Sequence, residues 1–230
     1  MRDTRLVFID GIPGSGKTTT ARSVDAVLAQ RSVEVRCFLE EHPDHPLHVG
    51  GPLHPSGRTT GAAFFGRYTV DSFVDESLRR WRTFVNAAER ADAVHVVESY
   101  PYQSAARVLL QMDASTDRIR EYAAAVEQIV NVLRPVVIYF DRRDVAGALR
   151  AISEQRGPEW TTYAVQLVTD CPYGRRRELH DLEGALVFMS AYKAVMDDLL
   201  GDSRLLAQKL GDCAGRWEAC YQQIWAFLEI

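Results

Sequence analysis

The residues best suited to chemistry form one short run near the start of the chain. Residues 11–18 follow the pattern Gly-x-x-x-x-Gly-Lys-Ser/Thr without interruption, as Gly11, Ile12, Pro13, Gly14, Ser15, Gly16, Lys17 and Thr18. Glycine lets successive backbone N–H groups turn inward around an anion. Lys17 can then reach the β- and γ-phosphates of a nucleoside triphosphate, and the Thr18 hydroxyl can bind Mg²⁺. This glycine-rich loop, together with Thr19, therefore predicts a site for ATP and Mg²⁺.

The flanking sequence supplies the setting that this pattern requires. The apolar run 6–9 predicts a buried strand before the loop, and Ala21, Val24 and Leu28 repeat at helical spacing after it. The loop should therefore end at a helix N-terminus, whose dipole adds to the attraction for anions. The alternative is a Gly-rich turn that joins a strand to a helix without binding a ligand.

Acidic residues end the next two predicted strands. The alternating segment 33–39 ends at Glu40 and Glu41, and the apolar run 94–97 leads to Glu98. Ligands of open parallel sheets bind at the carboxyl ends of the strands. Glu40 is therefore the candidate base for an acceptor hydroxyl, with Glu41 as its substitute, and Glu98 is the candidate for the Mg²⁺ hydration shell. The alternatives are solvated loop carboxylates for the first two and a capping residue for Glu98.

The rest of the chain alternates between strand and helix patterns. Further strands are predicted over 136–140 and, weakly, over 204–208, and helices over 70–90, 103–112, 116–133, 144–154, 184–200 and near the C-terminus. This order predicts an α/β fold whose five-stranded parallel sheet is covered on both faces. We expect residues 1–230 to form a single domain.

Two segments outside the predicted sheet are candidates for ligand contacts. Residues 155–182 are rich in arginine and contain the breakers Gly157-Pro158 and Cys171-Pro172, so we expect an irregular flap over the nucleotide. Arg150, Arg156 and Arg175 are its candidate phosphate ligands, with Arg156 in a catalytic role, although each is equally explained as a solvated surface residue.

The loop and helix over about 40–90 form the predicted acceptor side. Asp44 and His45, together with Tyr102 and Gln103, are expected to contact the acceptor substrate. His42, His45, His48 and His54 crowd this loop. A metal site is the weaker interpretation, because the intervening prolines prevent a helical pair and no cysteine joins them. Trp81, Phe84 and Tyr100 either line the pocket or pack in the core.

Bulk composition narrows the class of ligand. The 230 residues carry a net charge of −4, so no basic field is available for a nucleic-acid polymer, and we expect a small-molecule acceptor. No apolar run approaches the roughly 20 residues of a membrane span, and no signal peptide opens the chain, which favours the cytoplasm. Four scattered cysteines predict reduced thiols rather than a zinc site or disulfides. Whether two copies form a homodimer stays open.

Three places resemble a known superfamily. They are Phe8-Ile9-Asp10-Gly11 before the loop, the strand-ending Glu40 and Glu98, and Tyr139-Phe140-Asp141 followed by a helix and the arginines 150–156. In element order the whole chain resembles the P-loop nucleoside and nucleotide kinases, especially the thymidylate-kinase-like group. The resemblance implies a P-loop NTPase three-layer α/β/α sandwich in which residues 155–182 are an arginine-rich lid over the phosphates.

The resemblance also implies a function. Such kinases transfer the γ-phosphate of ATP to a hydroxyl of a small molecule. The sequence departs from the group at Ser99-Tyr100, because its members carry an arginine after the acidic residue of the third strand. The acceptor therefore stays open among a nucleoside, a nucleotide, a sugar-like metabolite and an antibiotic. The alternative function is a nucleotide-binding regulatory switch with slow hydrolysis, which would not need an acceptor base.

Overall fold

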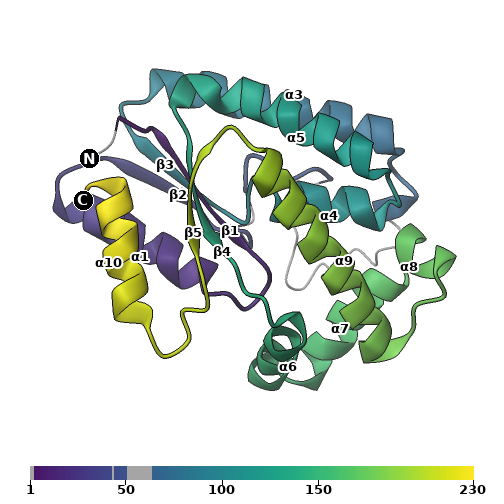
Figure 1. Ribbon diagram of the computed structural model, residues 1–230. Helices are drawn as coiled ribbons and strands as arrows, with labels where there is room; N and C mark the ends of the chain where they lie inside the picture. The colour runs from purple at the N-terminus through teal and green to yellow at the C-terminus, as the bar shows by residue number, and fades with distance from the viewer. Residues whose placement is uncertain (1–2, 43, 51–63) are drawn as a thin grey trace.

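A five-stranded parallel sheet forms the centre of the molecule (Figure 1), and this confirms the predicted α/β class. The computed structural model describes residues 3–42, 44–50 and 64–230. The strands are β1 (Leu6–Gly11), β2 (Val35–Phe38), β3 (Val94–Glu98), β4 (Val136–Phe140) and β5 (Leu206–Leu210). They lie in the order β2-β3-β1-β4-β5, and each pair of neighbours is parallel. Each connection between consecutive strands is therefore a crossover from one end of the sheet to the other.

The register brings the functional candidates to one edge of the sheet. Ile9 pairs with Glu98 of β3, and Gly11 pairs with Phe140 of β4. β1, β3 and β4 are buried along their whole length because helices cover both faces, which explains why their sequences are mostly apolar. The glycine-rich loop and Glu98 therefore leave the sheet side by side.

Two helices cover one face of the sheet. They are α1 (Lys17–Gln30), which follows the glycine-rich loop, and α10 (Trp217–Leu228) at the C-terminus. Val24 and Leu28 of α1 and Ile224 of α10 belong to one buried apolar cluster with the strand residues of this face. In Figure 1 the two helices, purple and yellow, lie on the same side of the strands.

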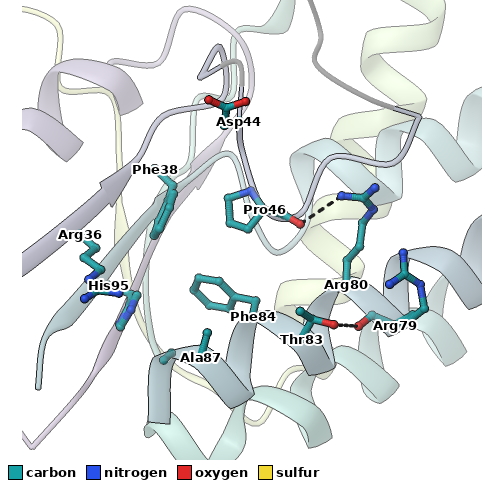
Figure 2. A pocket seen from close by; sticks show the side chains of 11 residues that line it. Arg36, Phe38, Asp44, Pro46, Arg79, Arg80, Thr83, Phe84, Ala87 and His95 are labelled. Atoms are coloured by element: carbon teal, nitrogen blue, oxygen red, sulfur yellow. Dashed lines mark hydrogen bonds between the residues drawn. The ribbon is translucent and has the colours of Figure 1, made fainter. Parts of the chain in front are cut away.

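The other face carries the larger core. It is covered by α3 (Val70–Arg90), α4 (Gln103–Gln111), α5 (Thr116–Val130) with the 3-10 turn η1 (Asn131–Leu133), and α9 (Asp181–Asp202). Trp81 of α3 is fully buried, and its Nε1 donates a hydrogen bond to the Tyr122 hydroxyl at 3.1 Å. Phe84 is also buried in this core and lines, beside β2, a cavity of about 300 Å³ (Figure 2).

The segment expected as an irregular flap is helical. It contains the end of α6 (Val145–Arg156), then α7 (Pro158–Thr169) and α8 (Pro172–Arg176). The predicted breakers divide these helices: Gly157 has φ 83°, and Pro158 and Pro172 each occupy a first turn, where a missing N–H costs no hydrogen bond. α7 packs against α9. The helix α9 ends at Asp202, two residues later than expected, and β5 likewise begins two residues later than expected, at Leu206.

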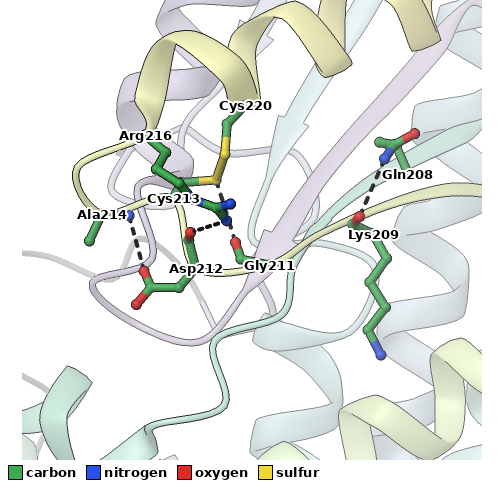
Figure 3. The surroundings of a disulfide bond; sticks show 8 residues. All are labelled: Gln208, Lys209, Gly211, Asp212, Cys213, Ala214, Arg216 and Cys220. Atoms are coloured by element: carbon green, nitrogen blue, oxygen red, sulfur yellow. Dashed lines mark hydrogen bonds between the residues drawn. A yellow bond between two sulfur atoms is a disulfide. The ribbon is translucent and has the colours of Figure 1, made fainter.

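The prediction that all cysteines are reduced was wrong for two of them. Cys213 and Cys220 form a disulfide, with Cα atoms 6.1 Å apart (Figure 3). The Arg216 N–H donates to the Cys213 carbonyl at 2.9 Å, so the chain turns back before α10 and brings the two side chains together. Cys37 and Cys171 are free thiols. No helix in the described ranges combines the length and apolar character needed to cross a bilayer.

Candidate functional site

The glycine-rich loop has a conformation that its glycines make accessible. Gly11 and Gly16 have φ values of 143° and 97°, and a Cβ atom added at Gly11 would lie only 2.8 Å from the Phe140 carbonyl oxygen. At Gly16 the added atom would meet the Trp217 indole at 2.2 Å. The loop is therefore closely bounded by β4 on one side and by the start of α10 on the other.

Lys17 lies inside the loop rather than in solvent. Its Nζ donates a hydrogen bond to the Ile12 carbonyl oxygen at 3.0 Å, and its side chain is buried. Burial lowers the pKa of Lys17, while the nearby Glu40 and Glu98 act in the opposite direction. The buried Ser15 hydroxyl has no hydrogen-bond partner. A buried cation and an unpaired hydroxyl fit an anionic ligand such as a phosphate. Of the other predicted loop residues, Gly14 and Thr19 are exposed and Pro13 is half-buried.

Asp10 is a structural anchor that sequence reasoning did not single out. One carboxylate oxygen accepts from the Gly11 N–H at 2.7 Å, and the other accepts from the N–H groups of Tyr102 at 2.7 Å and Gln103 at 3.1 Å. Burial raises the pKa of Asp10 to about 6. The carboxylate therefore ties the start of the glycine-rich loop to the start of α4. An acidic residue at the end of an otherwise apolar strand was the available signal.

Thr18 and Glu98, the two predicted metal ligands, are in direct contact. The Thr18 hydroxyl donates to Glu98 Oε1 at 2.5 Å, and Glu98 Oε2 accepts from the Glu40 N–H at 3.1 Å. Burial raises the pKa of Glu98. A hydroxyl and a carboxylate are hard oxygen donors of the kind that Mg²⁺ prefers. Thr18 and Glu98 are therefore chemically suited to hold this ion or its water ligands.

Glu40 is held by three side chains, and it lies in a turn two residues after β2, which ends at Phe38, earlier than expected. Ser99 Oγ and Gln103 Nε2 each donate to Oε2 at 2.9 Å, while a guanidinium nitrogen of Arg107 lies 3.6 Å from Oε1. Burial by itself raises the pKa of Glu40, but Arg107 and Lys17 outweigh it, and the pKa is lowered overall. The carboxylate is thus ionised and oriented.

Sequence reasoning missed Ser99 and Arg107. Ser99 is buried in the left-handed region at φ 63°, an unusual conformation for a serine, and this backbone turn accompanies its hydrogen bond to Glu40. Arg107 lies four residues after Gln103, so both occupy one face of α4. That spacing was the signal that could have identified Arg107.

The candidate lid arginines occupy different environments. Arg156 at the end of α6 makes an ion pair with Glu41 at 3.2 Å, so the flap segment contacts the residue after Glu40. Arg150 is exposed. Arg142, which was not predicted, donates to the Gly14 carbonyl oxygen at 3.2 Å. The structure thus joins Arg156 to the loop after β2 and Arg142 to the glycine-rich loop.

The predicted acceptor residues divide between two surfaces. Asp44 is exposed and lines the cavity of Figure 2 together with Pro46, Phe38 and the α3 arginines, away from the glycine-rich loop. His45, which lies between Asp44 and Pro46 in the sequence, is buried and stacks on Tyr100, with ring centroids 5.2 Å apart. Tyr102 is buried in the large core.

The histidines that the structure describes are not arranged as a metal centre. Within residues 3–42, 44–50 and 64–230, no group of three or more His, Cys, Asp or Glu side chains is arranged to hold a metal ion. His45 and His48 stack on each other at 4.5 Å instead. Residues 51–63, which include His54, lie outside the described residues.

Comparison with known proteins does not assign this chain to a family. No family model matches this chain, and no curated protein matches it.

Proposed function

We propose that this protein is a P-loop kinase that transfers the γ-phosphate of ATP to a hydroxyl group of a small molecule. One observation carries the proposal: the Glu98 carboxylate contacts both the Thr18 hydroxyl, at 2.5 Å, and the Glu40 N–H, at 3.1 Å. A phosphate-binding loop and a candidate base thus adjoin the same side chain. Phosphoryl transfer needs this arrangement, because it depends on positioning and charge neutralisation more than on covalent chemistry by the protein.

The donor half binds the triphosphate. Lys17 leaves the Ile12 carbonyl and turns to the β- and γ-phosphates, and the loop N–H groups surround the β-phosphate. Thr18 and Glu98 would hold Mg²⁺ or its water ligands, and the bound ion would neutralise charge on the phosphates. The acceptor oxygen attacks the γ-phosphorus, the bond to the bridging oxygen breaks, and ADP leaves.

Glu40 accepts the proton of the acceptor hydroxyl in this proposal. Its hydrogen bonds from Ser99 and Gln103 both reach Oε2, whereas Oε1 lies 3.6 Å from the Arg107 guanidinium. A carboxylate that stays ionised can take the proton as the oxygen–phosphorus bond forms. Arg156 and the helices of residues 155–182 form the lid in this scheme, and they meet the acceptor loop through Glu41.

Substitution of Lys17 tests the proposal. We expect the wild-type protein to bind a non-hydrolysable ATP analogue with Mg²⁺ and to transfer label from γ-labelled ATP to a hydroxylated compound. In Lys17→Ala, analogue affinity should fall at least tenfold, by the order expected for a lost charge-assisted contact, and transfer should be lost. Lys209→Ala is the matched control, because this lysine is half exposed and lies on β5.

Two results would contradict the kinase assignment. One is unchanged transfer in Lys17→Ala. The other is ATP hydrolysis without a phosphorylated product across nucleosides, nucleotides, sugars and hydroxylated antibiotics, which would favour the nucleotide switch.

A further inference from the structure

The acceptor half of the proposed site, around Glu40, His45 and Gln103, contains buried hydrogen-bonding atoms that have no partner among the residues that the structure describes. Gln103 is 2% exposed, and its Nε2 donates to Glu40, but its Oε1 has no partner. His45 is 3% exposed, and its Nε2 likewise has no partner. An unsatisfied buried polar group costs about 1–3 kcal/mol, so such groups in a folded protein call for an explanation. A bound ligand supplies one.

The protonation of His45 defines the kind of contact that it can make. Its Nδ1 accepts a hydrogen bond from the Leu47 N–H at 3.2 Å, so the neutral ring carries its proton on Nε2. Burial lowers the pKa of His45 to about 3, and the ring is uncharged at neutral pH. His45 thus offers one N–H donor, and Gln103 offers one carbonyl acceptor.

These two atoms belong to the same neighbourhood as Glu40. The His45 ring stacks on Tyr100, the residue after Ser99, and Ser99 and Gln103 both donate to Glu40 Oε2. The donor comes from the loop after β2, and the acceptor comes from the start of α4, which also holds the candidate base through Gln103 Nε2.

Two arginines that the structure describes beside this half, Arg107 and Arg80, are already paired with carboxylates. Arg107 lies 3.6 Å from Glu40 and lowers the pKa of this carboxylate more than any other neighbouring cation does. Arg80, whose guanidinium also reaches the Pro46 carbonyl oxygen, is 2.7 Å from Glu76. A phosphate ester carries nearly two negative charges and is normally bound by such cations. Here it would instead face the carboxylates of Glu40 and Glu98.

We propose that the acceptor is an uncharged alcohol, such as a nucleoside or a free sugar, and that it is recognised by hydrogen bonds to His45 Nε2 and Gln103 Oε1. Phosphate monoesters of the same compounds are rejected. The inference rests on the proposed kinase function and names the substrate class of the same site. It separates the nucleoside and sugar alternatives from the nucleotide alternative, which the sequence left open.

Matched pairs of compounds test this inference. The full-length protein is saturated with a non-hydrolysable ATP analogue and Mg²⁺, so that the glycine-rich loop cannot bind the added phosphate. Binding of thymidine, cytidine, adenosine, guanosine, glucose and ribose is then compared by calorimetry with binding of their 5′- or 6-phosphates. We expect at least one uncharged member to bind at least tenfold more tightly than its phosphate ester, with a change in the NMR signal of His45 Nε2.

A variant checks the role of His45. His45→Phe keeps an aromatic ring in the stack but removes the donor, and it should weaken the uncharged ligand about tenfold, as expected for one lost hydrogen bond. His95→Phe is the matched control, because His95 is a buried histidine that lines the cavity of Figure 2 instead.

The outcomes are distinguishable from failure of the kinase assignment. If the phosphate esters bind more tightly, or if no uncharged member of the series binds while the ATP analogue does, the inference is overturned. Loss of analogue binding itself would contradict the proposed function. The wild-type comparison decides the result even where His45→Phe does not fold.

Discussion

The two halves of the candidate site are built in different ways. The donor half is the contiguous glycine-rich loop with α1 behind it, and much of its contact with a ligand would come from backbone N–H groups. The acceptor half combines Glu40, His45, Ser99 and the first turns of α4, and it works through side chains. A site formed by consecutive residues can be recognised as a sequence motif, whereas a site assembled from several segments has no sequence pattern of its own.

The halves also differ in charge. The donor half contains the buried Lys17 and the contact from Arg142, which suits a triphosphate. The acceptor half holds the Glu40 carboxylate with its paired Arg107 and two neutral, stacked histidines. Glu98 touches both halves. The difference indicates that one half binds by charge and the other by hydrogen bonding.

The largest expected effect is a loss of kcat without a loss of ATP affinity, which distinguishes the acceptor half from the donor half. Glu40→Gln keeps the size of the side chain but removes the base, so kcat should fall by a factor of roughly 10²–10⁴. Affinity for ATP should barely change, because Glu40 belongs to the acceptor half. Steady-state kinetics and analogue binding measure the two effects.

Glu41→Gln is the control for that experiment, since Glu41 is exposed and pairs with Arg156. If Glu41→Gln loses activity while Glu40→Gln does not, the base has been misassigned by one residue. If neither substitution matters, Glu98 becomes the candidate base.

An intermediate effect concerns the acid stability of the acceptor half. Burial lowers the pKa of His45 to about 3 in the folded protein, against an ordinary value near 6.5. The unfolded chain therefore takes up the proton first, and stability is lost as pH falls from about 6.5 toward 3. Between pH 7.5 and 4.5 this histidine should reduce the free energy of unfolding by about 2–3 kcal/mol.

Urea denaturation of His45→Phe at the two pH values measures that loss. The variant should lose about 2–3 kcal/mol less than the wild type on acidification, a difference set by the same pKa displacement. The exposed His180, replaced by Phe, is the control. An equal loss in the wild type and His45→Phe would mean that His45 is protonated in the folded state.

The smallest effect tests the contact between the lid and the acceptor loop. Arg156 and Glu41 are 3.2 Å apart, with side chains 46% and 69% exposed, so their coupling should be only about 0.2–1 kcal/mol and should weaken with salt. A double-mutant cycle with Arg156→Gln and Glu41→Gln measures it. A coupling energy above about 2 kcal/mol would show a pair far less solvated than an exposed one.

The sequence by itself determined the features that depend on local pattern. Burial on both faces makes β1, β3 and β4 mostly apolar, and a one-sided core gives α3 its helical spacing, so these elements were predictable. The chain reversal at Gly11–Thr18 was equally clear, because only glycine adopts these φ values readily. Glu98 was placed at a strand end by the same reasoning.

The tertiary structure alone decided which distant residues meet. Arg107 approaches Glu40, 67 positions earlier, and Asp10 binds N–H groups of α4, 92 and 93 positions away. Cys213 and Cys220 were misread because their pairing depends on a turn before α10, and the breakers after Arg156 proved to be helix starts. Periodicity reports whether a residue is buried, but the partner of a buried polar group is chosen by strand order and helix packing, which leave no mark in the local sequence.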